Sequence, residues 1–127
     1  MSGSKVVQMR ILKRSETEAA NAKEMGNVAF KSEDYQTALN CYEKCLNEIA
    51  VKSNSATLSI LHGNCAAAHL KLKQFEKALE HASASLDCAQ NEKGYFRKGT
   101  ALMNLNRYSE AKDIFAEGKH FTTLLSH

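Results

Sequence analysis

Lys23-Glu24-Met25-Gly26-Asn27, followed by Tyr35-Gln36-Thr37-Ala38-Leu39-Asn40-Cys41-Tyr42, is the clearest copy of a pattern that this chain contains three times. The shared element is an aromatic residue with alanine three positions later, and it occurs at Tyr35 and Ala38, Phe75 and Ala78, and Tyr108 and Ala111. The second alanine follows the first by 40 residues, and the third follows the second by 33. A helix-turn-helix unit that recurs about every 34 residues buries its apolar surface by stacking on its neighbours. The sequence therefore predicts an all-α array of three stacked units.

The composition is that of one small helical domain without a membrane segment. The chain has 127 residues, 43% of them hydrophobic, and it contains no proline and no tryptophan. A chain of this length has room for a single core, and without proline it contains few strong helix breakers. No run reaches the roughly 18 consecutive apolar residues that a membrane span requires, and the N-terminus is charged rather than an apolar signal core. We therefore expect a cytoplasmic domain.

Helix signals along the chain predict six helices. The first is expected over residues 16–31, with Ser15 as its N-cap and Glu18 as the capping-box partner. After a turn at 32–34, apolar residues spaced three and four apart predict a second helix over 35–51, which a polar segment at 52–55 ends. The later helices are expected to begin near Ala56, Phe75, Glu92 and Tyr108.

These helices divide the chain into an N-terminal arm (1–14), a three-unit domain (15–123) and a short tail (124–127). The units are expected at about 19–55, 56–90 and 91–123. The arm is basic because it contains Lys5, Arg10, Lys13 and Arg14.

The cysteines raise the question of a metal site or a disulfide. They are Cys41, Cys45, Cys65 and Cys88, and the first two lie one helical turn apart. Cys45 occupies the position of Ser85 and Gly118 in the other two units, where an array requires a small residue. Cysteine is a small and readily buried side chain. We therefore interpret the cysteines as reduced packing residues and predict neither a metal nor a cofactor site.

The three units resemble the tetratricopeptide repeat family over about residues 16–121. The matching small and aromatic packing positions are Gly26, Ala38 and Tyr42 in the first unit, Ala66 and Ala78 in the second, and Gly99, Ala111 and Phe115 in the third. A single match would be weak, but three in register are specific. The resemblance implies a right-handed superhelical array that serves as a protein-binding platform rather than as a catalyst.

Polar residues on the first helix of each unit are expected to face one concave groove. Lys23 and Asn27 lie four residues apart on the first of these helices, and Lys93 and Arg97 lie four apart on the last. Asn64 lies on the middle one. Two lysines, an arginine and two amides can bind a main-chain carboxylate and a neighbouring acidic side chain, because charge-assisted hydrogen bonds are strong. The pattern therefore favours an acidic peptide as the ligand.

The same positions resemble the carboxylate clamp of co-chaperone tetratricopeptide domains, which hold the C-terminal Glu-Glu-Val-Asp tail of heat-shock chaperones. The resemblance is carried by the strings KEMGNVAF, GNCAAAHLKL and KGYFRKGTAL. It implies that the terminal aspartate carboxylates are held by Lys23, Asn27, Asn64 and Lys93. Arg97 would serve an upstream peptide or acidic group, and Phe30 would receive the valine side chain. The implied partner is heat shock protein 90 or heat shock protein 70.

Other functions have less support in the sequence. The net charge is only +3, from 17 basic and 14 acidic residues, and no aromatic stacking motif accompanies the lysines, which argues against nucleic acid binding. No phosphate loop, nucleophile elbow or metal-ligand spacing predicts an enzyme. Two alternatives keep the fold: a scaffold subunit that binds another protein through its groove, and a targeting domain related to those of a phosphatase or a peptidyl-prolyl isomerase.

The end of the last helix suggests a further contact. Family members commonly add a seventh helix after the third unit, whereas only residues 122–127 remain here. The apolar side chains of Phe121, Leu124 and Leu125 are therefore expected to be exposed. Their exposure predicts self-association through this helix, or a partner that covers it.

Overall fold

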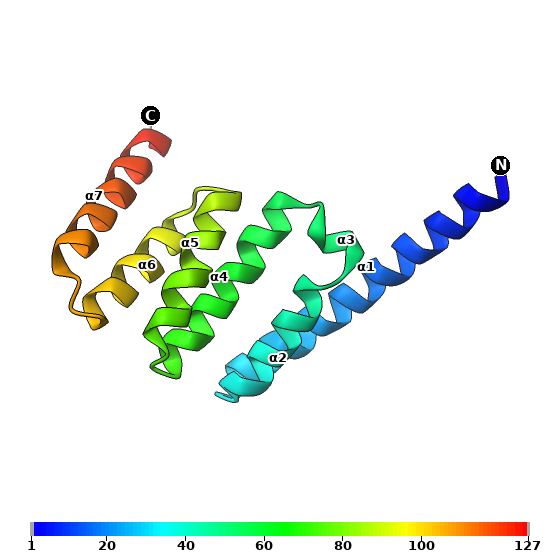
Figure 1. The fold of residues 1–127 in the computed structure, drawn as a ribbon, viewed down its shortest axis with the longest axis horizontal. Helices are drawn as coiled ribbons and strands as arrows, with labels where there is room; N and C mark the ends of the chain where they lie inside the picture. The colour runs from blue at the N-terminus through cyan, green and yellow to red at the C-terminus, as the bar shows by residue number, and fades with distance from the viewer. Residues whose placement is uncertain (1, 127) are drawn as a thin grey trace.

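A computed structural model of the chain describes residues 2–126, where it contains seven α-helices and no strand (Figure 1). In chain order these are α1 (Ser2–Lys31), α2 (Tyr35–Leu46), α3 (Ile49–Lys52), α4 (Ser55–Lys71), α5 (Phe75–Cys88), α6 (Glu92–Asn104) and α7 (Tyr108–Leu125). The all-α superhelical fold predicted from the sequence is confirmed. Within the described range no helix is both long and apolar enough to cross a bilayer. Met1 and His127, at the ends of the predicted arm and tail, lie outside the described residues.

Three helical hairpins stack side by side. α1 packs on α2, α4 on α5 and α6 on α7, and neighbouring hairpins meet through α2 against α4 and α5 against α6. Figure 1 shows the resulting row of helices, with α1 at one end and α7 at the other. Small residues let the helices approach closely, and the fully buried alanines are Ala38, Ala66, Ala68, Ala78, Ala82, Ala101 and Ala111.

The turn inside each hairpin has the same geometry. A non-glycine residue with positive φ lies two positions before the second helix of each hairpin, and these residues are Glu33 (64°), Lys73 (59°) and Asn106 (61°). The next amide donates to the carbonyl five positions back at 2.9 Å, in the pairs Asp34 to Ala29, Gln74 to His69 and Arg107 to Leu102. Such a left-handed ending satisfies carbonyl groups that the helix end would leave unpaired. The three units therefore share their turns as well as their packing residues.

The core between the hairpins includes two cysteines. Cys45 and Cys65 are among the largest fully buried side chains, together with Leu39 and Leu61. The Cys45 thiol donates to the Ala19 carbonyl at 3.3 Å, which agrees with its predicted role as a packing residue. Burial, with a smaller effect of Glu43, raises the pKa of the Cys65 thiol to about 12, so this thiol stays protonated at neutral pH.

The first helix begins much earlier than the sequence signals indicate. α1 starts at Ser2 rather than at residue 16, so the basic arm is helical and continuous with the first unit. Ser15 was predicted to be an N-cap but lies in mid-helix and is only 6% exposed. Its hydroxyl donates to a Glu48 carboxylate oxygen at 2.9 Å and accepts from the Ala50 amide at 3.0 Å. The prediction of an N-cap at Ser15 was wrong because the side chain hydrogen bonds to Glu48 and Ala50, which lie more than 30 residues away and give no local signal in the sequence.

The second helix is shorter than predicted. α2 ends at Leu46 instead of residue 51, and the short helix α3 follows. Glu48 has the extended backbone of a helix N-cap (φ −72°, ψ 138°), and Ser15 from α1 supplies the cap that the side chain of Glu48 does not provide. The spacing of 40 residues between Ala38 and Ala78 exceeds the usual repeat length because α3 is inserted between the first two units. Val51 of α3 is buried against the core.

Candidate functional site

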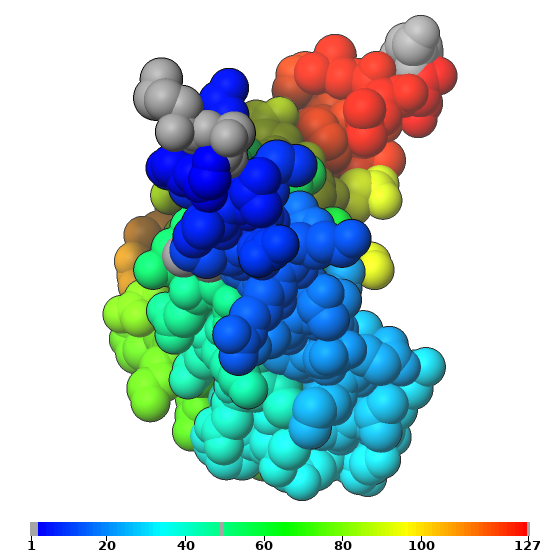
Figure 2. Space-filling model, turned by 90° about the vertical axis from the view of Figure 1, so that its right-hand side faces the viewer, coloured from blue at the N-terminus to red at the C-terminus, as the bar shows by residue number. Residues whose placement is uncertain are grey.

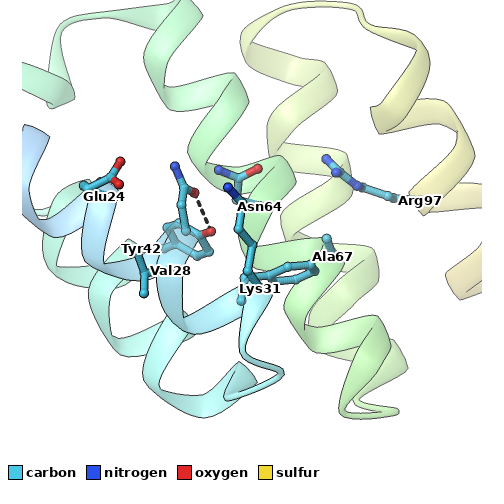
Figure 3. Close-up of a pocket in the computed structure, with 9 residues that line it drawn as sticks. Glu24, Val28, Lys31, Tyr42, Asn64, Ala67 and Arg97 are labelled. Carbon is cyan, nitrogen blue, oxygen red and sulfur yellow. Dashed lines mark hydrogen bonds between the residues drawn. The ribbon is translucent and has the colours of Figure 1, made fainter.

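A cavity of about 270 Å³ opens between α1, α2, α4 and α6 (Figure 3). It is lined by Glu24, Asn27, Val28, Phe30, Lys31, Tyr42, Asn64, Ala67 and Arg97. Four of the six residues singled out in the sequence therefore line one cavity: Asn27, Phe30, Asn64 and Arg97. They come from the first helix of each of the three hairpins.

Lys93 lies beside this cavity rather than in it. It lines two further hollows of about 520 and 560 Å³, and Arg97 lines both of them as well. Asn64 borders the first of the two. Arg97 therefore connects the three hollows along the face of α4 and α6, and Lys93 lies one helical turn from it.

Lys23 is placed apart from the other predicted residues. It lines a hollow of about 260 Å³ between α1 and the start of α4, together with Cys45, Asn54 and Thr57. Lys23 precedes Asn27 by one turn of α1, or about 6 Å along the helix axis. The structure thus brings five of the six residues to connected hollows and leaves Lys23 in a separate one.

Phe30 forms part of the cavity wall. Its ring packs edge-to-face on Tyr35, with the ring centroids 5.2 Å apart and the planes at 72°. This contact anchors the ring at the end of α1, while the rest of its surface remains available to the cavity.

Arg97 is a half-buried cation without a counter-charge. Its side chain extends from α6 toward Asn64 on α4, as Figure 3 shows. The ion pairs in residues 2–126 are Arg14 with Glu18 and Arg107 with Glu110, so Arg97 has no acidic partner in the described part of the chain. Burial lowers the pKa of Arg97, but a guanidinium remains charged at any physiological pH. An anionic ligand would supply the missing charge.

Gly63 provides the space in which this guanidinium lies. A Cβ atom at Gly63 would come within 2.7 Å of Nη1 of Arg97. Any larger residue at position 63 would therefore move the guanidinium away from its position beside Asn64.

Tyr42 lines the cavity, whereas the repeat pattern predicted it only as a packing residue. Its hydroxyl donates to Asn27 Oδ1 at 2.8 Å, the bond drawn as a dashed line in Figure 3. The ring is otherwise buried, with 2% of the residue exposed. The sequence contained one signal of this role. The third unit has Phe115 at the equivalent position, and a tyrosine buried there requires a hydrogen-bond partner for its hydroxyl.

Comparison with known proteins gives matches along most of the chain. Tetratricopeptide repeat profiles match residues 17–91 and 92–118. Tetratricopeptide repeat protein 12 of Mus musculus is 36% identical over 94 residues, which cover 73% of this chain and 12% of that protein. Peptidyl-prolyl cis-trans isomerase FKBP4 of Homo sapiens is 36% identical over 104 residues, covering 73% of this chain and 22% of the isomerase. The chain thus spans less than a quarter of each of these two relatives.

Two solved structures show the same fold with a peptide bound. The second tetratricopeptide domain of Spaghetti (RPAP3), bound to the HSP90 peptide SRMEEVD, has a TM-score of 0.76 at 25% identity and covers 91% of this chain and 95% of that one. The second such domain of human RPAP3, in complex with the HSP70 peptide SGPTIEEVD, has a TM-score of 0.72 at 28% identity and covers 82% of each chain.

Proposed function

Because the chain belongs to the tetratricopeptide repeat family, we propose that it is a non-enzymatic cytoplasmic adaptor or co-chaperone that binds the C-terminal Glu-Glu-Val-Asp tail of heat shock protein 90 or heat shock protein 70. The binding site is the groove formed by α1, α4 and α6. The two peptide-bound structures with the same fold support this proposal. The observation that carries it is the unpaired Arg97 between hollows that also contain amide donors.

Each groove residue has a role that its chemistry supports. Asn27, Asn64 and Lys93 donate hydrogen bonds to the terminal carboxylates, and Arg97 binds an acidic side chain or carbonyl farther up the peptide. The cavity wall at Phe30 receives the valine side chain. Lys23 joins the site by extending its flexible side chain along α1 toward Asn27.

The proposal is tested by calorimetric titration with the peptide SRMEEVD as the free acid and with its C-terminus amidated. Amidation removes an acceptor of charge-assisted hydrogen bonds, each of which contributes about 1.5–3 kcal/mol, so we expect the affinity to fall by about tenfold or more. Affinity for the free acid is expected to decrease as salt rises, because salt screens exposed charges. Equal affinity for the two peptides, or none for either, would contradict the proposal.

Paired variants test whether the groove is the site. Arg97→Ala is expected to lower the affinity at least tenfold while the melting temperature stays nearly unchanged, because the side chain forms no ion pair within the described residues. Lys112→Ala removes the same charge from an exposed position on α7 and is expected to bind like the unmodified chain. Equal losses in the two variants would indicate a general charge effect instead of a specific site.

The end of α7 favours a second candidate interaction. Leu124 and Leu125 are 61% and 67% exposed. The exposure predicted for Phe121 was wrong, because its ring packs on Tyr95 with the centroids 5.8 Å apart and is only partly exposed. Phe121 and Leu125 also line the hollow that contains Lys93. A scaffold that associates with itself or with another protein through this helix is the alternative function.

A further inference from the structure

Tyr42 reaches the groove because its ring packs against α1 at Gly26. A Cβ atom at Gly26 would lie 2.7 Å from Cε1 of the Tyr42 ring. The ring therefore fits against α1 only where the facing residue has no side chain. From this position on α2 its hydroxyl meets the Asn27 side chain, one residue further along α1.

The hydrogen bond determines which way the Asn27 carboxamide faces. A carboxamide has an acceptor oxygen and an NH₂ group with two donor hydrogens, and the two ends are similar in size. A phenol can donate or accept, but the Tyr42 proton has no other acceptor among residues 2–126, so the hydroxyl donates to Oδ1 and leaves the Nδ2 end for other partners. Tyr42 is the only side chain among residues 2–126 that hydrogen bonds to the Asn27 side chain. This bond is therefore the hydrogen bond that selects one orientation of the amide.

The orientation matters for a carboxylate ligand. A carboxylate can only accept hydrogen bonds, so it binds the NH₂ end of Asn27 and is repelled by the carbonyl end. The phenol also keeps its proton over the neutral range, because burial, followed by Cys65 and Cys41, raises the pKa of Tyr42. The donor that holds the amide is therefore always present.

We infer that Tyr42 is a positioning residue of the groove, whose hydroxyl holds the Asn27 amide with its NH₂ group toward an incoming carboxylate. Tyr42 has this role only if the groove binds a carboxylate, as proposed above. In this role the Tyr42 hydroxyl acts through Asn27 rather than as a direct ligand of the carboxylate.

The test is a double-mutant cycle measured by calorimetry with the free-acid peptide SRMEEVD. Tyr42→Phe removes only the hydroxyl, and we expect it to weaken binding about fivefold without a change in helix content by circular dichroism. In the Asn27→Ala background the same substitution is expected to change the affinity less than twofold. A tyrosine that only supported packing would weaken binding equally in both backgrounds.

Tyr108→Phe is the matched control. The Tyr108 hydroxyl also donates to an asparagine, Asn106 Oδ1 at 2.7 Å, but this pair is exposed at the α6–α7 turn, away from the groove. We expect Tyr108→Phe to bind like the unmodified chain. Unchanged affinity in Tyr42→Phe, or an equal loss in the Asn27→Ala background, would overturn the inference while leaving the proposed function intact.

A second readout needs no ligand. In a ¹⁵N-labelled sample the two Nδ2 protons of Asn27 are expected to shift in Tyr42→Phe and to stay in place in Tyr108→Phe. If the unmodified chain fails to bind the free-acid peptide, the proposed function fails, and the role of Tyr42 in binding fails with it. If the peptide binds but the Asn27 signals do not respond to Tyr42→Phe, only the inference about Tyr42 fails.

Discussion

At the scale of single residues, the groove depends on positions that carry no charge. Gly63 leaves room for the Arg97 guanidinium, and Gly26 lets the Tyr42 ring approach α1. That Asn27, Asn64 and Arg97 line one cavity could be predicted from the helical spacing of polar residues, whereas the same spacing wrongly placed Lys23 there. The roles of Gly63 and Tyr42 could not, since they depend on contacts between helices that the spacing along one helix does not contain.

Gly63→Ala is the first prediction at this scale. The added methyl group would meet the far end of a flexible side chain, so the fold is expected to remain while the guanidinium moves out of its place beside Asn64. We expect the affinity for SRMEEVD to fall by about three- to tenfold, at most the loss caused by Arg97→Ala. Calorimetry measures it, and Gly3→Ala is the control because a methyl there would meet nothing within 4 Å. Equal affinity in both variants would show that Gly63 does not determine the Arg97 position.

At the scale of elements, the hairpins could be predicted and the connection between the first two could not. Apolar periodicity and the aromatic-to-alanine spacing located the helices from α4 to α7 to within a few residues. α3 was missed because Ser15 caps it from α1, and no local signal marks such a partner. Lys23 likewise shares a helical face with Asn27, yet it lines a different hollow, formed with the start of α4.

Ser15→Ala tests the cap. Loss of the hydroxyl removes the bonds to Ala50 and Glu48, so we expect a destabilisation of about 1 kcal/mol, typical of a lost helix cap. Urea denaturation measures the free energy of unfolding. Ser4→Ala, at an exposed position of the same helix, is expected to have almost no effect. A Ser15→Ala chain as stable as the control would mean that α3 forms without this contact.

The α4–α5 hairpin contains a histidine cluster that predicts a pH dependence. Nδ1 of His62 lies 3.0 Å from Nδ1 of His81, and the His69 ring stacks on His81 with centroids 5.2 Å apart. Burial, followed by the neighbouring His69 and His62, lowers the pKa of His81 from 6.5 to about 4. The folded chain thus binds this proton less readily than the unfolded chain. The contribution to stability is complete above about pH 6.5 and is lost as the pH falls toward 4.

We therefore expect the free energy of unfolding to decrease between pH 7 and pH 5. His81 accounts for about 1 kcal/mol of this decrease, because solvent around its partly exposed ring weakens the penalty for charging it. His81→Gln cannot titrate and is expected to lose that part of the dependence, whereas His120→Gln, exposed on α7, should keep it. Urea denaturation at both pH values measures the difference. An unaltered pH dependence in His81→Gln would contradict the assignment.

At the scale of the whole molecule, the array has unequal ends. Figure 2 shows the N-terminal stretch of α1 in front, with the C-terminal end of α7 behind it at the same edge of the molecule. The leucines at the end of α7 are exposed, and a stacked array is most soluble when its terminal faces are polar. The composition predicted one small helical domain, but only the arrangement of the helices shows that α1 and α7 lie at opposite ends of the row.

Self-association is the prediction at this scale. Sedimentation equilibrium of the 127-residue chain is expected to show a mass that increases with concentration. Leu124→Ser with Leu125→Ser removes the exposed leucines at the end of α7 and should keep the chain monomeric if this helix forms the contact, whereas Met25→Ser removes a similarly exposed side chain from α1 and should not. A monomeric unmodified chain would exclude this contact, and calorimetry on the same samples would show whether peptide binding is independent of it.

The two ends of the long helix α1 are expected to unfold locally on different timescales. Residues 3–14 are all exposed, so their helical conformation depends mainly on backbone hydrogen bonds, whereas the later part of α1 packs on α2 and α3. An unsupported helix of about 12 residues is marginal in water. Amide protons at the start of α1 should therefore exchange with solvent long before those near Gly26, and a trypsin-like protease would find its first cleavable bonds among the basic residues there. One continuous helix thus contains a segment that opens freely and a segment that opens only when the domain unfolds.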